Sequence, residues 1–143
     1  MPLTEGYCKG YDLKVKEDML FGKIGEKFTE ELFEGNNKIE IKTERDIWKT
    51  TGNIAIEIRC NNRPSGISTT EADTWIHLLA YNGIIEGGFL LKVRVIKDMI
   101  KKLHKSGSLN IKMGGDNNAS QMVLIPIKEL FPVFERNGSK VKV

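Results

Sequence analysis

The sequence predicts a single mixed α/β domain, because segments with the apolar spacing of helices are interspersed with segments that alternate like strands. A chain of 143 residues fits one domain, and its 40% hydrophobic and 29% charged side chains suit a globule with its own core. We assign residues 1–17 to a lead-in, residues 18–131 to the core and residues 132–143 to a tail.

Composition argues against several other classes of protein. The longest apolar runs, such as Ile54–Ile58 and Gly87–Leu91, fall far short of the roughly 20 residues that span a bilayer. Met1–Gly10 lacks the apolar stretch of a secretory signal. The two cysteines, Cys8 and Cys60, are too few for a disulfide framework, so we expect free thiols, a cytoplasmic location and no membrane partner.

The first half of the chain predicts a helix followed by a β-hairpin. Apolar residues in Gly22–Phe33 fall on one helical stripe, and Gly35–Asn37 supplies the residues that close a helix. Lys38–Glu44 and Asn53–Arg59 both alternate apolar with polar side chains, as strands do. The polar connector Arg45–Gly52 ends in a turn signal, so a hairpin is the economical interpretation.

The middle of the chain predicts a loop and a second helix. Pro64 and Gly66 place Asn61–Ser68 in a loop. Thr70 with Asp73 resembles a capping box, so we expect a helix from about Glu71 to Tyr81. Trp75 and His77 would then pack in or against that helix rather than bind a ligand.

The last part predicts a strand, a short helix and another strand. Phe89–Val95 follows two glycines and reads as a strand, and the apolar stripe from Ile96 to Leu103 is spaced for a helix. Gly114–Asn118 is expected to form a loop before a late strand at Met122–Ile127. Gly138–Val143 looks like a frayed end.

Acidic side chains on the expected hairpin are the main candidates for chemistry. Strand geometry places Glu40, Lys42 and Glu44 on one face at intervals of about 6.6 Å, and Glu57 comes from the neighbouring strand. Carboxylates that converge in this way suit a hard cation such as Mg²⁺. A solvated polar face is the competing interpretation. Glu57 favours a site, because it lies between two isoleucines and a half-buried carboxylate is costly without a partner.

Four blocks, taken in order, resemble the small phage-encoded nucleases of the PD-(D/E)XK superfamily, to which Holliday-junction resolvases and restriction-type endonucleases also belong. The resemblance covers roughly residues 18–82, and its ordered series is more specific than the Glu-x-Lys pair alone. The blocks are Gly25-Glu26, Ile39-Glu40-Ile41-Lys42, Thr51–Glu57 and Ser65–Trp75. The fold that it implies is a restriction-endonuclease-like core, in which helices flank a mixed central sheet containing a three-stranded meander.

The resemblance also implies a Mg²⁺-dependent DNA endonuclease, selective for branched or junction DNA, in which Mn²⁺ substitutes for Mg²⁺. Glu40 matches the metal-binding glutamate and Lys42 the lysine that orients the attacking water. Glu26 matches an acid supplied by the first helix, and Glu57 the acid of the second strand. Together Glu26, Glu40 and Glu57 would bind the metal.

One departure from the superfamily leaves alternatives open. An Asp usually stands shortly before the Glu-x-Lys, whereas this chain has Glu34 and two asparagines there. Either Glu34 or Glu57 replaces that aspartate, or Glu40 takes the Asp role and Glu57 the Glu role, with Arg59 in the place of the lysine. Further acids nearby are Glu44 and Asp46.

Hydroxyls and cations around this region are candidates for contacts to the DNA backbone. A capped turn and a solvated strand face are the competing interpretations. A non-catalytic DNA-binding module and a protein-interaction domain are the alternative functions, and a junction-cutting enzyme would be a homodimer with two active sites. The candidate DNA contacts are Ser65, Ser68, Thr69, Thr70, Lys92 and Arg94.

Overall fold

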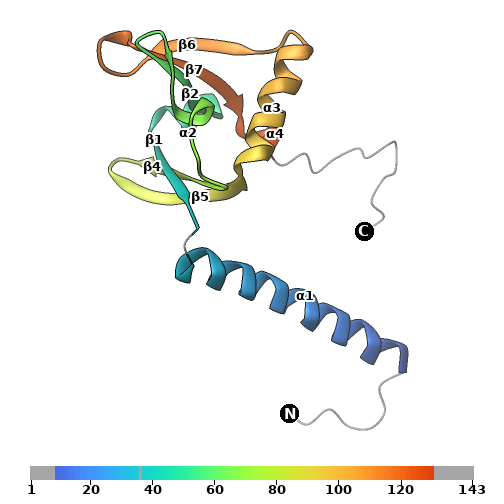
Figure 1. The fold of residues 1–143 in the computed structure, drawn as a ribbon. Coiled ribbons are helices and arrows are strands. Elements are labelled where there is room, and N and C mark those ends of the chain that lie inside the picture. The colour runs from blue at the N-terminus through green and yellow to red at the C-terminus, as the bar shows by residue number, and fades with distance from the viewer. Residues whose placement is uncertain (1–8, 36, 131–143) are drawn as a thin grey trace. The chain divides into compact units, whose positions relative to one another are not determined.

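The computed structural model describes residues 9–35 and 37–130, with the side chains described from residue 14 onward (Figure 1). The fold is mixed α/β, as the sequence predicts. The chain forms two compact units, Met1–Asn37 and Lys38–Val143. Cys60 is a free thiol, as expected, while Cys8 and the expected frayed end lie outside the described residues.

The first unit consists of one long helix, α1 (Lys9–Glu34). It contains the predicted helix and begins 13 residues earlier, so the boundary expected between residues 17 and 18 falls inside it. The backbone N–H of Gly35 and the side-chain amide of Asn37 both donate to the Glu31 carbonyl at the end of this helix. Among the described helices, none is long and apolar enough to cross a membrane.

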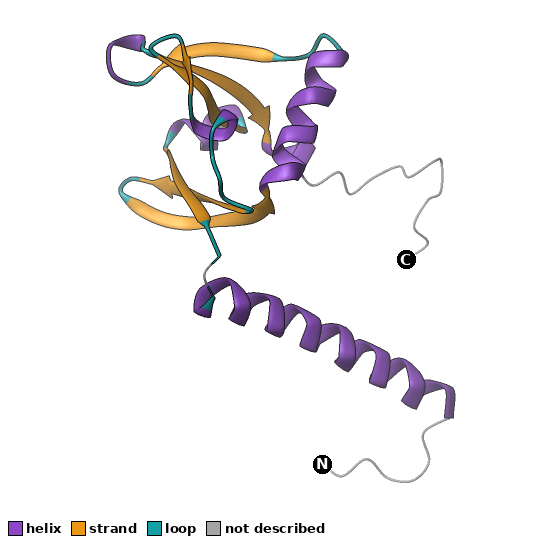
Figure 2. Ribbon diagram, viewed as in Figure 1, coloured by secondary structure: helices purple, strands orange, loops and turns teal. Residues whose placement is uncertain are grey.

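The second unit contains two sheets (Figure 2). The first sheet has the order β1-β4-β5, formed by β1 (Ile39–Arg45), β4 (Thr74–Tyr81) and β5 (Ile84–Lys92). β1 pairs with β4 in parallel, and β4 pairs with β5 antiparallel. The expectation of a single central sheet is therefore wrong, although this first sheet is mixed.

The helix predicted over Glu71–Tyr81 is wrong, because β4 occupies this stretch. Buried residues alternate along much of it, and Asn82-Gly83 joins it to β5 with positive φ at both turn residues. That is the geometry of a tight hairpin turn, for which Asn-Gly between two apolar runs is a strong sequence signal. The capping-box pattern at Thr70 and Asp73 competed with this signal and misled the prediction.

The second sheet has the order β3-β2-β7-β6 and is antiparallel throughout. Its strands are β3 (Arg63–Pro64), β2 (Asn53–Cys60), β7 (Ser120–Pro126) and β6 (Asn110–Gly114). The strands predicted at 38–44, 53–59 and 122–127 are confirmed, and β6 was not predicted. The predicted hairpin is wrong, because β1 and β2 belong to different sheets.

Short helices connect the sheets. The predicted polar connector contains α2 (Ile47–Thr51) between β1 and β2. The Trp48 indole N–H donates to the Ala80 carbonyl at 2.7 Å, so this partly buried aromatic ties α2 to β4. α3 (Val93–Lys105) follows β5, so the strand predicted to reach Val95 ends at Lys92. α4 (Ile127–Leu130) follows β7.

One hydrophobic core joins both sheets and α3. Ile56 of β2, Val123 of β7 and Ile96 of α3 are fully buried, and Trp75 of β4 is 1% exposed. Burial of such side chains is the main favourable contribution to folding, so this core fixes the two sheets against each other.

Candidate functional site

A cavity of about 210 Å³ lies between the two sheets. The register of β1 against β4 pairs Lys42 with His77, and the alternation of the strand puts Glu44 on the same face as Lys42. Glu57 reaches the cavity from β2. The residues that line it are Lys42, Thr43, Glu44, Ala55, Glu57, Trp75, His77 and Met122.

Two larger hollows in the second unit are lined by fewer acidic side chains. One, of about 430 Å³, has Glu129 as its only acid, and the other, of about 520 Å³, is lined by Trp48 and lysines without an acid. The cavity between the sheets combines two carboxylates with a lysine and a histidine. It is therefore the candidate active site, although it is the smallest of the three.

Glu57 is held by two hydroxyl groups. Ser65 Oγ donates to one carboxylate oxygen at 2.5 Å, and Ser120 Oγ donates to the other at 2.6 Å. The hydrogen bonds from Ser120 and Ser65 lower the pKa of the Glu57 carboxyl below its ordinary value of 4.5; burial opposes this effect, and the Lys42 ammonium adds to it. The side chain is therefore a fixed carboxylate at neutral pH.

The loop after β2 is shaped to hold Glu57. Gly66 adopts φ +55°, and a Cβ built there would lie 2.3 Å from the Glu57 carbonyl oxygen, so the close approach requires glycine. Ser68 Oγ donates to the Ile58 carbonyl at 2.8 Å, and Thr70 Oγ1 donates to Glu40 at 3.2 Å. Three of the four hydroxyls predicted to contact DNA thus bond within the protein, and Thr69 is exposed.

Lys42 links the acidic side chains. Its ammonium lies 2.6 Å from Glu40 Oε1 and 5.9 Å from the centroid of the Trp75 ring. It also contributes to the lowered pKa of Glu57. Lys42 lines the cavity and Glu40 does not, and the oxygens of Glu40 bond Lys42 and Thr70.

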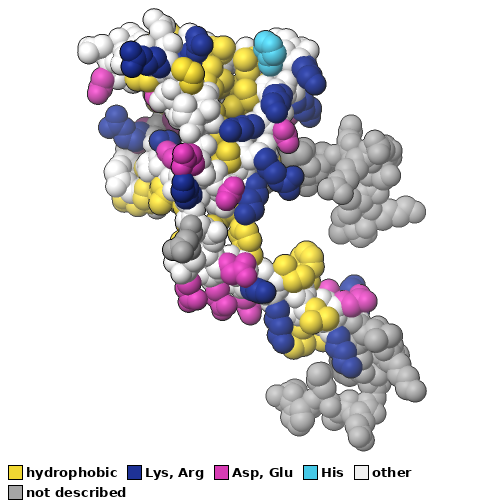
Figure 3. Space-filling view, viewed as in Figure 1, with side chains coloured by type: hydrophobic (Ala, Val, Ile, Leu, Met, Phe, Trp, Pro, Cys, Tyr) yellow, Lys and Arg dark blue, Asp and Glu magenta, His cyan; other side chains and the backbone are white. Residues whose placement is uncertain are grey.

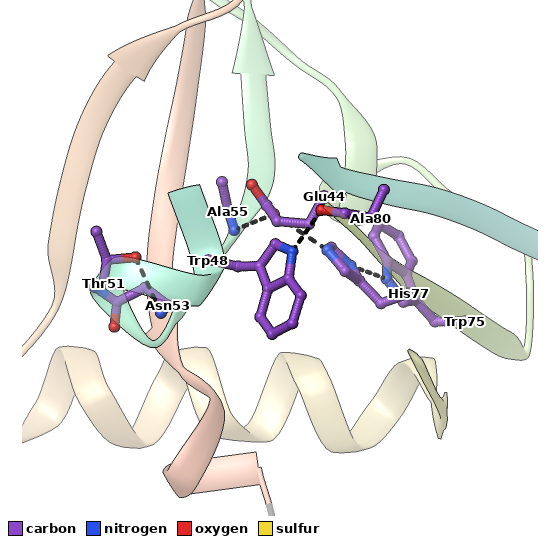
Figure 4. Close-up of polar contacts among 8 residues, drawn as sticks. All are labelled: Glu44, Trp48, Thr51, Asn53, Ala55, Trp75, His77 and Ala80. Carbon is purple, nitrogen blue, oxygen red and sulfur yellow. Dashed lines mark hydrogen bonds and ion pairs between the residues drawn. The ribbon is translucent and has the colours of Figure 1, made fainter. Parts of the chain in front are cut away.

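Glu44 is better placed for chemistry than Glu40, which the sequence had favoured. Its Oε2 accepts the Ala55 backbone N–H at 2.8 Å and lies 3.2 Å from His77 Nε2 (Figure 4). The side chain is 20% exposed and lines the cavity. The two-residue period of the strand already placed Glu44 on this face, but the resemblance drew attention to Glu40.

The remaining predicted acids belong to other elements. Glu26 and Glu34 are exposed on α1, in the first unit. Asp46 accepts the Asn82 backbone N–H at 2.8 Å through Oδ1, which joins the start of α2 to the β4–β5 turn. Arg59 is exposed beyond an irregularity in β2 and does not line the cavity.

The two cations predicted to contact DNA lie at the junction of β5 and α3. Lys92 is the last residue of β5, and its ammonium lies 3.5 Å from Thr74 Oγ1. Arg94 is exposed in the first turn of α3. Lysines and arginines gather over α3 in the space-filling view (Figure 3), and its last turn is basic.

The donor set fits a magnesium ion better than a zinc ion. In residues 9–35 and 37–130, no group of three or more His, Cys, Asp or Glu side chains is arranged to hold a metal. Mg²⁺ keeps several waters and is bound by one or two carboxylates together with substrate phosphates. Glu44 and Glu57, as two carboxylates on one cavity, meet that lower requirement.

Comparison of the chain with protein-family models, curated proteins and solved structures gives no match.

Proposed function

We propose that this protein is a magnesium-dependent nuclease of the PD-(D/E)XK type that hydrolyses phosphodiester bonds in DNA. One observation carries the proposal: Lys42 and the two carboxylates Glu44 and Glu57, brought from two sheets, line the same cavity. The two hydroxyls bonded to Glu57 keep it charged, as a metal ligand must be.

The side chains divide the chemistry between them. Glu44 and Glu57 hold the divalent ion, which when bound lowers the pKa of water and neutralises charge on the phosphate. Lys42 places a positive charge beside the same cavity, where it attracts the phosphate and stabilises the charge that develops on it. Glu40 forms an ion pair with Lys42 at 2.6 Å and positions its ammonium.

The basic surface of α3 offers a complementary contact for the DNA backbone. Arg94, Lys101, Lys102 and Lys105 lie exposed along this helix. Such cations bind phosphates without reading sequence, so they orient the duplex rather than select a site. We include selectivity for branched or junction DNA in the proposal because the resemblance to the PD-(D/E)XK nucleases implies it.

The test is cleavage of supercoiled, linear, single-stranded and branched DNA with Mg²⁺, with Mn²⁺ and with EDTA. We expect cleavage by the wild type with either metal and none with EDTA. Glu57→Gln and Lys42→Ala should each lower the rate at least about 100-fold, because each removes a charge that acts on the reacting phosphate. Glu30→Gln, an exposed position on α1, is the matched control and should retain full activity. Undiminished metal-dependent cleavage by Glu57→Gln would refute the assignment.

A DNA-binding module without catalysis is the second candidate, because the basic surface of α3 is separate from the cavity. It predicts salt-sensitive DNA binding and no cleavage with either metal. The same set of assays therefore separates the two functions.

A further inference from the structure

Trp75, His77 and Glu44 form a hydrogen-bonded chain at the inner end of the cavity. The Trp75 indole Nε1 lies 3.1 Å from His77 Nδ1, and His77 Nε2 lies 3.2 Å from Glu44 Oε2 (Figure 4). Trp75 and His77 are each 1% exposed, so the bond between them is shielded from solvent. A buried imidazole with both nitrogens occupied is fixed in its role by its partners.

The partners of His77 determine which nitrogen carries its proton. An indole nitrogen can only donate a hydrogen bond, so Nδ1 of His77 must be the acceptor. In the neutral ring the proton then lies on Nε2, which donates it to Glu44. Trp75 and Glu44 therefore require the same tautomer of His77.

Two aromatic rings lie nearly parallel to the imidazole. The Trp75 ring lies beside it at a centroid distance of 6.4 Å and an interplanar angle of 18°, and Phe89 stacks on His77 at 5.5 Å and 8°. This packing prevents the ring from turning, so the direction of the Nε2–H bond is fixed along with its protonation.

The consequence falls on the two oxygens of Glu44. Oε2 receives both the His77 Nε2–H and the Ala55 backbone N–H. Within the described part of the chain, Oε1 has no hydrogen-bond or ion-pair partner, and Glu44 lines the cavity. Hydrogen bonds therefore fix Oε2, and Oε1 is available to bind a ligand.

We propose that His77 is a positioning residue, which orients Glu44 so that one carboxylate oxygen is presented to a divalent cation. This inference rests on the proposed function, because it assigns Glu44 as a ligand. Groups that hydrogen-bond a metal ligand from behind typically change metal affinity by about 10- to 100-fold when they are removed.

The first experiment needs no metal. Long-range ¹H–¹⁵N correlation spectra of the full chain report which imidazole nitrogen is protonated. We expect His77 to show a protonated Nε2 and an unprotonated, hydrogen-bonded Nδ1. Trp75→Phe should remove the hydrogen-bond contribution to the Nδ1 shift, while Glu44 keeps the proton on Nε2. A proton on Nδ1 in the wild type, or an unchanged Nδ1 shift in Trp75→Phe, would overturn the proposed orientation.

The second experiment measures Mn²⁺ binding to the same chain by electron paramagnetic resonance. His77→Phe keeps the aromatic stack but removes both hydrogen bonds, and should weaken Mn²⁺ binding by about 10-fold or more. His77→Gln offers an oxygen to Trp75 and an amide to Glu44, so it should recover most of the lost affinity. Circular dichroism melting curves establish that both variants are folded.

The outcomes separate this inference from the proposed function. If the wild type binds no Mn²⁺, the proposed function itself is wrong. If the wild type binds Mn²⁺ and His77→Phe binds it equally well, only the role of His77 is wrong. Equal loss of affinity in folded His77→Gln and His77→Phe would likewise contradict positioning through hydrogen bonds.

Discussion

Glu57 shows how single residues define this site. The sequence indicated that a carboxylate between two isoleucines needs a partner, and the structure supplies Ser65 and Ser120. Ser65 belongs to a block that the sequence singled out for contacts to phosphate. Ser120 lies 63 residues away from Glu57 along the chain and carries no local signal, so a pairing of this range could not be predicted from a pattern.

Replacing Ser120 by alanine should raise the pKa of Glu57 toward its ordinary value of 4.5, because Ser120 is the largest cause of the lowered pKa. At pH 7 the variant should be less stable by about 1.5 kcal/mol, the usual contribution of a hydrogen bond to a charged group. Since the pKa is lowered in the folded state, this stabilisation is present above pH 4.5 and is lost as the pH falls through the folded value.

Urea unfolding of both proteins between pH 7 and pH 3 measures this difference. Ser108→Ala, at an exposed serine, is the control and should follow the wild type at every pH. A stability gap that stays constant down to pH 3 would contradict the assigned cause.

At the scale of elements, sequence patterns predicted those features that depend on residues close together in the chain. Alternation located β1 and β2, an apolar run located most of β7, and apolar spacing located α1 and much of α3. Strand partners were not predictable, because β1 pairs with β4 and β2 with β7 across long stretches of chain. The sequence therefore predicted two residues of the candidate site but not their arrangement. Lys42 and Glu57 line one cavity, but they come from two sheets instead of one hairpin.

α3 offers a direct test of the shared core. Ile96 is fully buried between the sheets, whereas its neighbour Val95 is 37% exposed. Ile96→Ala should lower the free energy of unfolding by about 3 kcal/mol, through lost burial and the cavity left behind. Val95→Ala should change it by no more than about 0.5 kcal/mol, as surface substitutions usually do. Equal losses in urea unfolding would mean that α3 does not pack through this face.

For the whole molecule, charge distribution matters more than total charge. Twenty-two basic and 19 acidic residues leave a formal net charge of only +3. The basic residues of α3 nevertheless form one exposed surface, and binding to DNA depends on such local concentration. The sequence assigned Lys92 and Arg94 to one strand, because the strand end at Lys92 was not foreseen.

Removing two of these cations together should weaken DNA binding and reduce its salt dependence. For Lys101→Ala combined with Lys105→Ala, the slope of log K against log salt should fall by up to about 2, close to 0.9 for each phosphate that the variant no longer neutralises. Fluorescence anisotropy with labelled duplex DNA, at several salt concentrations, measures this slope. Lys27→Ala, which breaks an exposed ion pair with Glu31 on α1, is the control. An unchanged slope in the double variant would exclude α3 from the DNA interface.

The hydrogen bond from the Ala55 amide to Glu44 joins the second sheet to the first. The carboxylate proposed to bind the ion thus also connects the two sheets that line its cavity. A substitution of Glu44 would therefore change both the binding of the ion and the contact between the two sheets. A different ligand at this position would be tolerated only if another group replaced the hydrogen bond to Ala55.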